Sequence, residues 1–452
     1  MRLRKTITTI VATAILLAGW QLFAVIANQP ELIPSLPRLV RTLCEWLVSG
    51  SFYQSVGATI LRGVLGMSIS FVCAIGMAGL FARFEWVYEL FRPLLAIMRS
   101  IPVISFILLA LIFLNPESIP LMIAFLTMFP LLTENLTRGI LDLRPGLSIM
   151  ARQFHIKRSN VLFQIIYPQL KPFLYSGLAS AAGFGWRAII MGEVLSQCAF
   201  GIGSEMKRAQ NFIAVPELLA WTIVAVFISF FFDKGISKVA DITPKISFAN
   251  EDQTIPTPTL SVLDTKDISY QYGIQHFSHS FKKGIIYGIS APSGKGKTTL
   301  LNLIGGILLP TEGEIHPTRH FGIATIFQQP QLLPHLTAEE NIILPLSSFL
   351  TEEKAQRIAQ KHLQEMEMEP FGNRYPKELS YGQQQRIAIA RALAYPSPLL
   401  LMDEPFKGLD EALSHRIIER IREKQMKEER IILFTSHNPD EIRLLADEVI
   451  YL

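Results

Sequence analysis

Four stretches in the C-terminal half of this 452-residue chain carry side chains suited to a phosphorylated ligand. The first is rich in glycine, which lets backbone N–H groups approach phosphate closely. An apolar run precedes it and a helical pattern follows, so the positive end of a helix dipole would face the same ligand. We therefore interpret it as a P-loop. Its residues are Ala291, Pro292, Ser293, Gly294, Lys295, Gly296, Lys297, Thr298 and Thr299, with Ala291 at the position of the motif's first glycine.

Polar residues also follow three later apolar runs, which end at Phe327, Met402 and Phe434. In open α/β sheets ligands bind at the carboxyl ends of the strands, so we expect these residues to gather around the P-loop. Transfer of a phosphoryl group to water needs charge neutralisation and a positioned water molecule. We accordingly assign Lys297 to the β- and γ-phosphates of ATP, Thr298, Asp403 and Gln328 to Mg²⁺ or its water, Glu404 to general-base catalysis, and His437 to the γ-phosphate and Glu404.

The elements that must hold these residues belong to a chain of uneven composition. Half of the residues are hydrophobic and the mean hydropathy is +0.32, with the apolar runs concentrated in the first 235 residues. The net charge of +4 gives no electrostatic footprint for nucleic acid. The length suits two or three domains, so we expect a membrane part followed by a water-soluble part.

Six hydrophobic segments predict an all-α membrane domain over residues 1–240, embedded in a lipid bilayer. Basic residues at 2–5, 83–92, 144–171 and 234–238 fall on one face, which the positive-inside rule marks as cytoplasmic. Both ends and the C-terminal domain are then cytoplasmic. A proline-containing linker is expected at 241–259 and an α/β P-loop NTPase domain at 260–452. The expected spans are 6–27, 57–82, 93–114, 118–137, 172–197 and 213–232.

The stretch Leu379–Arg386, which reads L-S-Y-G-Q-Q-Q-R, resembles the L-S-G-G-Q signature of ABC transporter ATPases, with Tyr381 in place of one glycine. The resemblance covers residues 260–452, and all motifs stand in family order. It implies an ATP site shared with a partner ATPase domain, since the family's signature contacts the partner's γ-phosphate. By this resemblance the signature contacts are Ser380, Gly382 and Gln383, the D-loop is Gly408-Leu409-Asp410, and the adenine-stacking residue is Tyr272, with Tyr270 as the alternative.

A second resemblance lies between the fourth and fifth expected spans, where residues 149–168 are similar to the E-A-A…G…I-x-L-P coupling loop of binding-protein-dependent importer permeases. Ile149, His155 and Tyr167 replace the Glu, Gly and Leu of that motif. The pattern is most like the nitrate, sulfonate and taurine group. It implies a bacterial inner-membrane importer that works as a homodimer with a separate extracytoplasmic solute-binding protein.

Two other classes stay open at this point. ABC exporter half-transporters also join six spans to one ATPase, although their helices usually extend far into the cytoplasm. A non-transporting regulatory or mechanotransmitting ATPase is compatible with Ala291, Tyr381 and the altered coupling motif.

Two ionisable residues lie inside the fifth expected span, Arg187 and Glu193. Because charge at membrane depth is costly, they either mark a pathway, or pair with neighbouring spans or snorkel to the interface. If Arg187 borders the pathway, it favours an anionic solute.

Overall fold

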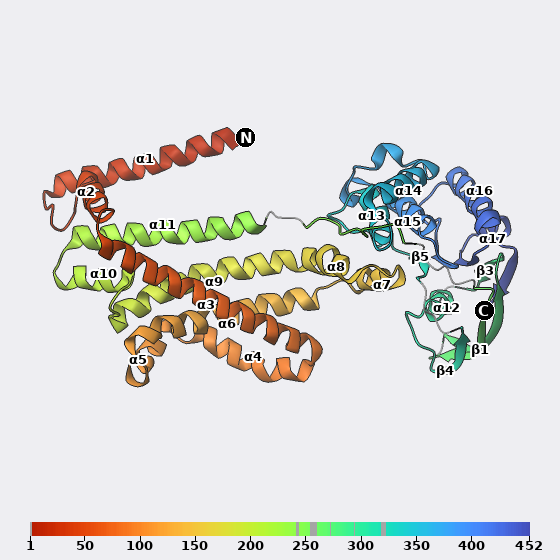
Figure 1. Cartoon of the computed structure of the whole chain (residues 1–452), viewed down its shortest axis with the longest axis horizontal. Helices are drawn as coiled ribbons and strands as arrows, with labels where there is room; N and C mark the ends of the chain where they lie inside the picture. The colour runs from red at the N-terminus through yellow and green to blue at the C-terminus, as the bar shows by residue number, and fades with distance from the viewer. Residues whose placement is uncertain (1, 241–243, 254–259, 272, 293, 318–321) are drawn as a thin grey trace. The chain divides into compact units, whose positions relative to one another are not determined.

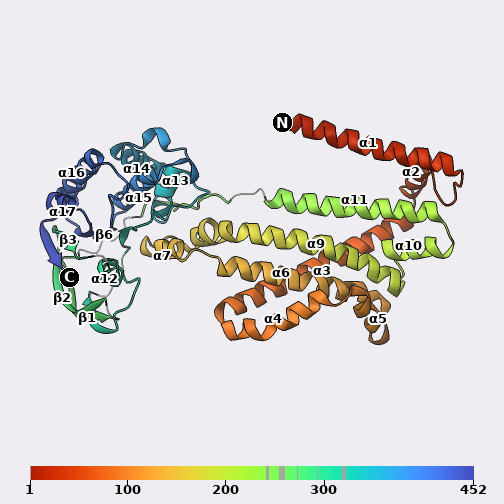
Figure 2. The ribbon, with the colours of Figure 1, turned by 180° about the vertical axis from the view of Figure 1, so that it is seen from behind.

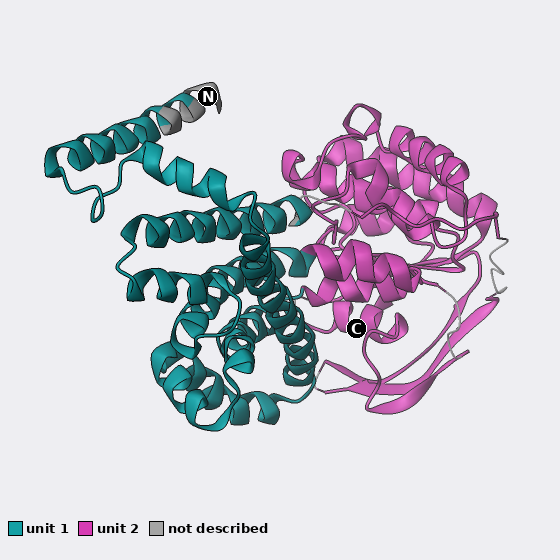
Figure 3. Ribbon diagram, turned by 60° about the vertical axis from the view of Figure 1, so that its left-hand side comes forward, with its two compact units in different colours: residues 1–143, 169–243 teal, residues 144–168, 244–452 magenta. Residues whose placement is uncertain are grey.

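The computed structural model describes residues 2–240, 244–253, 260–271, 273–292, 294–317 and 322–452; for residues 2–6, 9, 10 and 240 only the helix is described. The chain forms two compact units (Figure 3). The membrane unit comprises Met1–Leu143 and Gln169–Thr243, and the cassette unit comprises Arg144–Pro168 and Pro244–Leu452. A short segment from the N-terminal half therefore folds with the C-terminal half.

The membrane unit is helical, and its long helices run side by side in Figures 1 and 2. Helices α3 and α6 pack closely, because glycine lets the backbones approach: a Cβ atom at Gly66 would lie 2.6 Å from the Cβ of Ala124. The helices are α1 (Arg2–Ala27), α2 (Leu36–Trp46), α3 (Gly50–Arg83), α4 (Glu85–Ser100), α5 (Val103–Phe113), the 3₁₀ turn η1 (Pro116–Ser118), α6 (Ile119–Leu141), α9 (Tyr167–Ser196), α10 (Ile202–Asn211) and α11 (Val215–Ala240).

Four helices of the described chain are long and apolar enough to cross a membrane, or five if one bent pair counts as a span. The expected span over 93–114 is not one continuous helix, since α4 and α5 meet at an angle of 95° and form either a broken span or a re-entrant loop. Ile101 is extended at the break, as expected for a residue that precedes a proline, here Pro102. The described apolar part of α1, Val11–Ala27, falls among the shorter helices. By length and composition alone, the described helices therefore do not give the predicted six spans.

The segment between α6 and α9 contains α7 (Pro145–Gln153), α8 (Arg158–Asn160) and the π-helical turn η2 (Val161–Ile166). We call residues 144–168 the coupling segment. Its apolar side chains lie in the largest hydrophobic core of the cassette unit, where they pack with strands and helices from the C-terminal half. The buried members from this segment are Leu147, Met150, Ala151, Phe154, Ile156 and Ile165.

The cassette unit contains a five-stranded parallel sheet with strand order β5-β6-β7-β3-β8, and a three-stranded antiparallel sheet with order β2-β1-β4. Every residue of β6 and β7 is buried, as expected when helices cover both faces of a parallel sheet. The strands are β1 (Val262–Tyr270), β2 (Ile274–Lys282), β3 (Ile286–Ser290), β4 (Glu312–His316), β5 (Ala324–Ile326), β6 (Leu399–Asp403), β7 (Ile431–Thr435) and β8 (Glu448–Tyr451). The main helices are α12 (Lys297–Ile304), α13 (Ala338–Leu346), α14 (Glu352–Glu365), α15 (Tyr381–Ala394), α16 (Glu411–Glu428) and α17 (Pro439–Leu445).

Candidate active site

The glycine-rich turn joins β3 to the first residue of α12, Lys297, as the sequence predicts. Gly294 and Gly296 have positive φ angles of 82° and 89°, which glycine adopts without strain. Gly296 also packs against the β1–β2 turn, because a Cβ atom there would lie 2.6 Å from the carbonyl oxygen of Gly273. Ala291 does not have a positive φ, so its methyl group fits the loop.

Lys297 is buried, and its ammonium group reaches back across the loop. The Nζ atom donates to the carbonyl oxygen of Ala291 at 2.7 Å and of Pro292 at 3.4 Å. The backbone N–H of Lys295 donates to the same Pro292 carbonyl at 3.3 Å. The ammonium group of Lys297 therefore lies within the loop. A phosphate group bound there would replace the two carbonyl oxygens as its partner. Thr299 continues α12, whereas Ser293 and Tyr272 lie outside the described residues.

Asp403, the last residue of β6, connects three elements of the site. Its Oδ2 accepts from the hydroxyl of Thr298 at 2.9 Å, and its Oδ1 accepts from the hydroxyl of Thr435 at 2.7 Å. Burial raises the pKa of Asp403, while these two hydrogen bonds act against that rise. The sequence analysis paired Thr298 with Asp403 but missed Thr435, although Thr435 ends the neighbouring strand in parallel register with Asp403.

Glu404 has a positive φ of 48°, and its backbone N–H donates to the Thr435 hydroxyl at 3.0 Å. Its carboxylate contacts an imidazole and an ammonium group: Oε1 lies 3.1 Å from Nε2 of His437, and Oε2 lies 3.1 Å from Nζ of Lys407. Burial raises the pKa of Glu404, but hydrogen bonds from Lys407 and Gln328 and the charges of Lys407 and His437 outweigh it. The pKa therefore lies below its usual value, and the carboxylate is ionised at neutral pH. Sequence reasoning missed Lys407, three residues beyond Glu404.

The signature residues form the start of α15. Ser380 is the N-cap, and it makes a capping box with Gln383: the Ser380 hydroxyl accepts from the Gln383 N–H at 3.3 Å, and the Gln383 Oε1 accepts from the Ser380 N–H at 2.9 Å. The exposed Ser380 hydroxyl keeps its own proton for another acceptor. Among the described residues, no hydrogen bond or ion pair joins Ser380, Gly382 or Gln383 to the P-loop.

The oxygen atoms of Thr298 and Asp403 fit a divalent cation that prefers oxygen ligands, such as Mg²⁺. They lie within 2.9 Å of each other at the carboxyl end of β6, beside the loop that would hold the phosphates. Gln328 is exposed, and its side chain is one of the groups that lower the pKa of Glu404. Three or more His, Cys, Asp or Glu side chains do not cluster in a metal-binding arrangement anywhere in the described chain.

Comparison with known proteins agrees with this geometry. Residues 274–407 match the family described as "ABC transporter", and residues 68–233 match "Binding-protein-dependent transport system inner membrane component". An uncharacterized ABC transporter ATP-binding protein of Methanocaldococcus jannaschii is 34% identical over 201 residues, which cover 40% of this chain and 85% of that protein. This chain belongs to the ABC transporter family. Its cassette is homologous to the ATP-hydrolysing cassettes of transporters.

Further relatives of the transporter's cassette are named as import proteins. The thiamine import ATP-binding protein ThiQ of Yersinia pseudotuberculosis is 35% identical, over 42% of this chain and 86% of that protein. The Fe(3+) ions import ATP-binding protein FbpC of Rhizobium etli is 35% identical over 40% of this chain. The match covers 54% of that protein, so this chain spans about half the length of the relative. A solved dimeric cassette bound to ADP and Pi shares 32% identity at a TM-score of 0.40, covering 42% of this chain and 94% of that one.

The transporter's coupling segment is hydrogen-bonded to the end of the P-loop helix. The side-chain amide of Gln153, which is 4% exposed, donates to the carbonyl oxygen of Gly305 at 2.8 Å. The neighbouring Arg152 donates to the carbonyl of Gly306 at 2.6 Å. Both carbonyls follow directly after α12. Movement of the P-loop helix would therefore act on the coupling segment through two direct bonds.

The coupling segment also contacts the loop that begins at Gln328. Phe154 is fully buried, and its ring lies edge-on to Tyr395 with 5.2 Å between the ring centres. The guanidinium of the buried Arg391 lies 5.4 Å from the centre of the Phe154 ring and donates to the carbonyls of Pro330 and Gln331 at 2.9 and 2.8 Å. The sequence analysis did not single out Arg391; its place inside α15 would have suggested only an exposed helix position.

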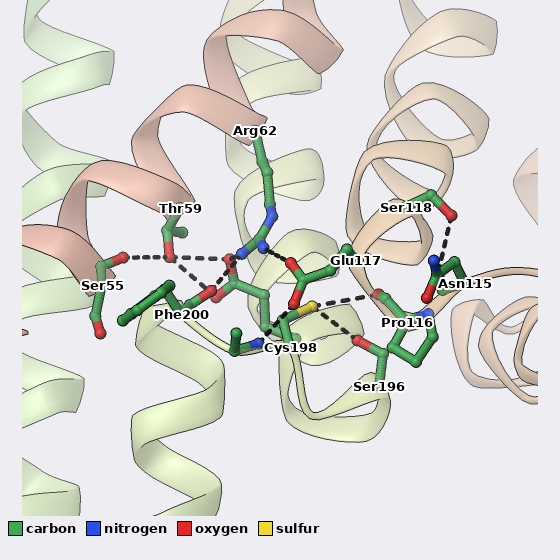
Figure 4. A network of polar contacts seen from close by, with 12 residues as sticks. Ser55, Thr59, Arg62, Asn115, Pro116, Glu117, Ser118, Ser196, Cys198 and Phe200 are labelled. Carbon is green, nitrogen blue, oxygen red and sulfur yellow. Dashed lines mark hydrogen bonds and ion pairs between the residues drawn. The ribbon is translucent and has the colours of Figure 1, made fainter.

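In the membrane unit, Glu193 is fully buried, and its partners Thr59 and Arg62 belong to the network of polar contacts in Figure 4. Its carboxylate accepts from Thr59 at 2.9 Å, from Arg62 at 2.7 Å and from the backbone N–H of Gly203 at 2.9 Å. Arg62 also pairs with Glu117 at 2.6 Å. The network joins α3, η1, α9 and the start of α10. Glu193 is thus paired with a neighbouring helix, which is one of the two alternatives that the sequence left open.

Arg187, on the same helix as Glu193, is exposed in the described chain. Phe184 and Met191, which lie three residues before and four residues after it, are also exposed, at 61% and 44%. Residues at these spacings share one face of a helix. This face of α9 carries a cation at the depth of an apolar span, so it must be covered by polar groups or by water when the protein is in a bilayer.

Proposed function

We propose that this chain is a fused permease–ATPase subunit of a bacterial inner-membrane importer, which works as a homodimer with a separate extracytoplasmic solute-binding protein. The observation that carries the proposal is the coupling segment, which belongs to the permease half in sequence and to the cassette core in structure. A connection of this kind lets closure of the cassettes reach the membrane helices. The import names of the cassette's relatives support the direction of transport.

In this proposal each ATP lies between two copies of the chain. Lys297 binds its phosphates from one side, and Ser380 and the backbone of Gly382 approach the γ-phosphate from the other copy. Mg²⁺, held by Thr298 and Asp403, would neutralise phosphate charge. Glu404 accepts the proton of the attacking water, and His437 orients that carboxylate. Two copies related by a twofold axis complete two equal sites.

The proposed topology has six crossings, with α1 and the bent pair α4–α5 each counted as one. An even number places both termini and the cassette on the cytoplasmic side, where the basic residues of the connections concentrate. The coupling segment then also faces the cytoplasm, as contact with the cassette requires.

We propose an organic or inorganic anion as the solute, because Arg187 supplies a positive charge on an exposed face within an apolar span. The second copy would cover this face and enclose a path between the two α9 helices. The cassette does not identify the solute, since its relatives are named for Fe(3+) ions, thiamine, glucose and spermidine/putrescine.

Transport is tested with the purified chain in proteoliposomes containing ATP on the cassette side. Labelled nitrate, taurine and an alkanesulfonate are supplied with osmotic-shock fluid from the native host as the source of binding protein. ATP-dependent movement toward the cassette side that requires this fluid supports the importer. Movement in the opposite direction without the fluid identifies an exporter. Hydrolysis without movement of a broad panel of organic and inorganic anions favours a non-transporting ATPase.

The homodimer is tested by cross-linking. One tagged chain carries a cysteine beside Lys297, and a differently tagged chain carries a cysteine beside Ser380. In the Glu404→Gln background with ATP, a disulfide between the two tags supports the shared site. A disulfide found only within single chains would refute it.

A further inference from the structure

The tyrosine in the signature contacts its own chain. The hydroxyl of Tyr381 donates to the carbonyl oxygen of Gln328 at 2.6 Å. The side chain of Gln328 is also one of the groups that lower the pKa of Glu404. The hydroxyl of a signature residue is thus bonded to the main chain of Gln328. The side chain of the same Gln328 acts on the proposed base of this chain.

The ring of Tyr381 fits against a glycine. A Cβ atom at Gly408 would lie 2.8 Å from Cδ1 of Tyr381, and Gly408 has a positive φ of 80°. The same glycine's carbonyl oxygen would lie 2.5 Å from a Cβ atom at Gly382. A glycine at 408 therefore creates the space that the tyrosine ring occupies, and the ring turns toward its own chain and leaves the Ser380 hydroxyl exposed.

Other contacts fix α15 to the same two loops. The amide of Gln385, which is fully buried, donates to the carbonyl of Pro405 at 3.0 Å, directly after Glu404. Arg391 holds the carbonyls of Pro330 and Gln331, two and three residues after Gln328. Tyr381 is the contact nearest to the start of the helix, where the signature residues lie.

We propose that Tyr381 is a positioning residue for ATP hydrolysis. Its hydroxyl fixes the main chain at Gln328. Its ring packs against Gly408, which directly follows the Lys407 that pairs with Glu404, so the proposed base and the start of α15 move together. The inference rests on the proposed function, in which Ser380 serves the ATP of a second copy. Gln328 lies at the ATP of its own chain, whereas Ser380 contacts the ATP of the second copy. Tyr381 then links the position of Ser380 at one ATP to the position of Gln328 at the other.

The test compares Tyr381→Phe, which keeps the ring and removes only the hydroxyl, with Tyr451→Phe at an exposed tyrosine of β8. Steady-state ATPase kinetics and thermal melting are measured on the purified full-length chain. Loss of one hydrogen bond that acts in the hydrolysis step lowers kcat by about fivefold, with KM within about twofold and an unchanged melting temperature. A kcat equal to wild type, or a loss fully explained by a lower melting temperature, overturns the proposal.

A double-mutant cycle tests the packing of the ring. Gly408→Ala brings a methyl group against Tyr381, adds strain at a positive φ and should lower kcat, as should Tyr381→Gly alone. In the double variant the combined loss should be smaller than the sum of the two single losses, because the clash is removed. Additive losses would contradict the contact. Failure of the proposed function is seen separately, as a wild-type chain without ATPase activity or a Glu404→Gln chain that still hydrolyses ATP.

Discussion

The guanidinium of Arg391 lies against the ring of Phe154, with 5.4 Å between its Cζ atom and the ring centre. Phe154 comes from the coupling segment, whereas Arg391 comes from the helix that begins with the signature. Burial lowers the pKa of Arg391 to about 10, so the group remains a cation at neutral pH. Its hydrogen bonds to Pro330 and Gln331 connect the coupling segment to the loop that reaches the proposed base.

The first prediction separates transport from hydrolysis. Phe154→Ala removes a fully buried ring, a change that typically costs about 3–5 kcal/mol of packing free energy. Uptake in proteoliposomes should fall at least about tenfold, while basal ATPase activity stays within about twofold, because the catalytic residues are untouched. Phe163→Ala, at an exposed position of the same segment, is the control. A parallel fall of uptake and ATPase activity would contradict this role.

The second prediction concerns the base. Glu404→Gln keeps the size of the side chain but removes the proton acceptor, so turnover should fall by about 10²-fold or more. Binding of ATP should persist, since the phosphate contacts of Lys297 remain. Single-turnover hydrolysis and nucleotide binding check this, with Glu419→Gln at an exposed position of α16 as control. Near-normal turnover would assign the base to another residue.

The third prediction concerns pH. Glu404 acts as a base only when ionised, so activity is lost as the pH falls through its pKa. Lys407 lowers that pKa, and Lys407→Met leaves the opposing effect of burial in place. The acidic limb of the plot of log kcat against pH should therefore move to higher pH. Lys427→Met, at an exposed lysine of α16, should leave the limb in place. A shift to lower pH, or no shift, would show that Glu404 does not govern this limb.

The fourth prediction concerns the exposed face of α9. Arg187→Gln should lower uptake of an anion by about tenfold, the equivalent of about 1.4 kcal/mol, and leave basal ATPase activity intact. Arg187→Lys should keep part of the uptake because it keeps the charge. Arg41→Gln changes another exposed arginine of the membrane unit and serves as control. Loss of the Arg187→Gln protein from the membrane would indicate a structural role instead.

The fifth prediction concerns the network around Glu193. Arg62→Ala leaves the fully buried Glu193 without its cation, and breaking a buried pair in this way typically costs about 3–5 kcal/mol. The melting temperature of the detergent-solubilised protein should fall clearly. Arg38→Ala breaks an exposed pair with Glu31, which is worth at most about 1 kcal/mol, and should change it little. Equal shifts in the two variants would mean that burial does not strengthen the Arg62 pair.

Much of the cassette could be predicted from sequence because its signals are local. The P-loop lies between a strand and a helix, and Asp403 ends an apolar run that forms a buried strand. The break between α4 and α5 also had a local signal, Pro102, but the uniformly apolar sequence of 103–113 suggested a continuing span. Hydropathy indicates whether a segment can be buried in a bilayer, but it does not indicate whether the chain changes direction within that segment.

The contacts that depend on tertiary structure could not be predicted. Phe154 and Arg391 are 237 positions apart in number, and no periodic pattern connects them. Tyr381 looked like a departure from a glycine-rich signature, and only the structure reveals that Gly408 makes room for its ring. Ion pairs such as Lys407 with Glu404 depend on rotamers and on a positive φ at Glu404, which sequence spacing alone does not determine.

The coupling segment and the cassette that it enters belong to one polypeptide, and Asn160 is hydrogen-bonded to Ser247, within the expected linker at 241–259. Tethering of this kind gives partners an effective concentration of the order of millimolar, so even a weak contact stays formed. A separately made cassette would have to displace the tethered one. The consequence is genetic: a chain with a defective cassette should not be rescued by supplying a healthy cassette alone, and in the proposed homodimer each defective copy disables the dimer that it enters.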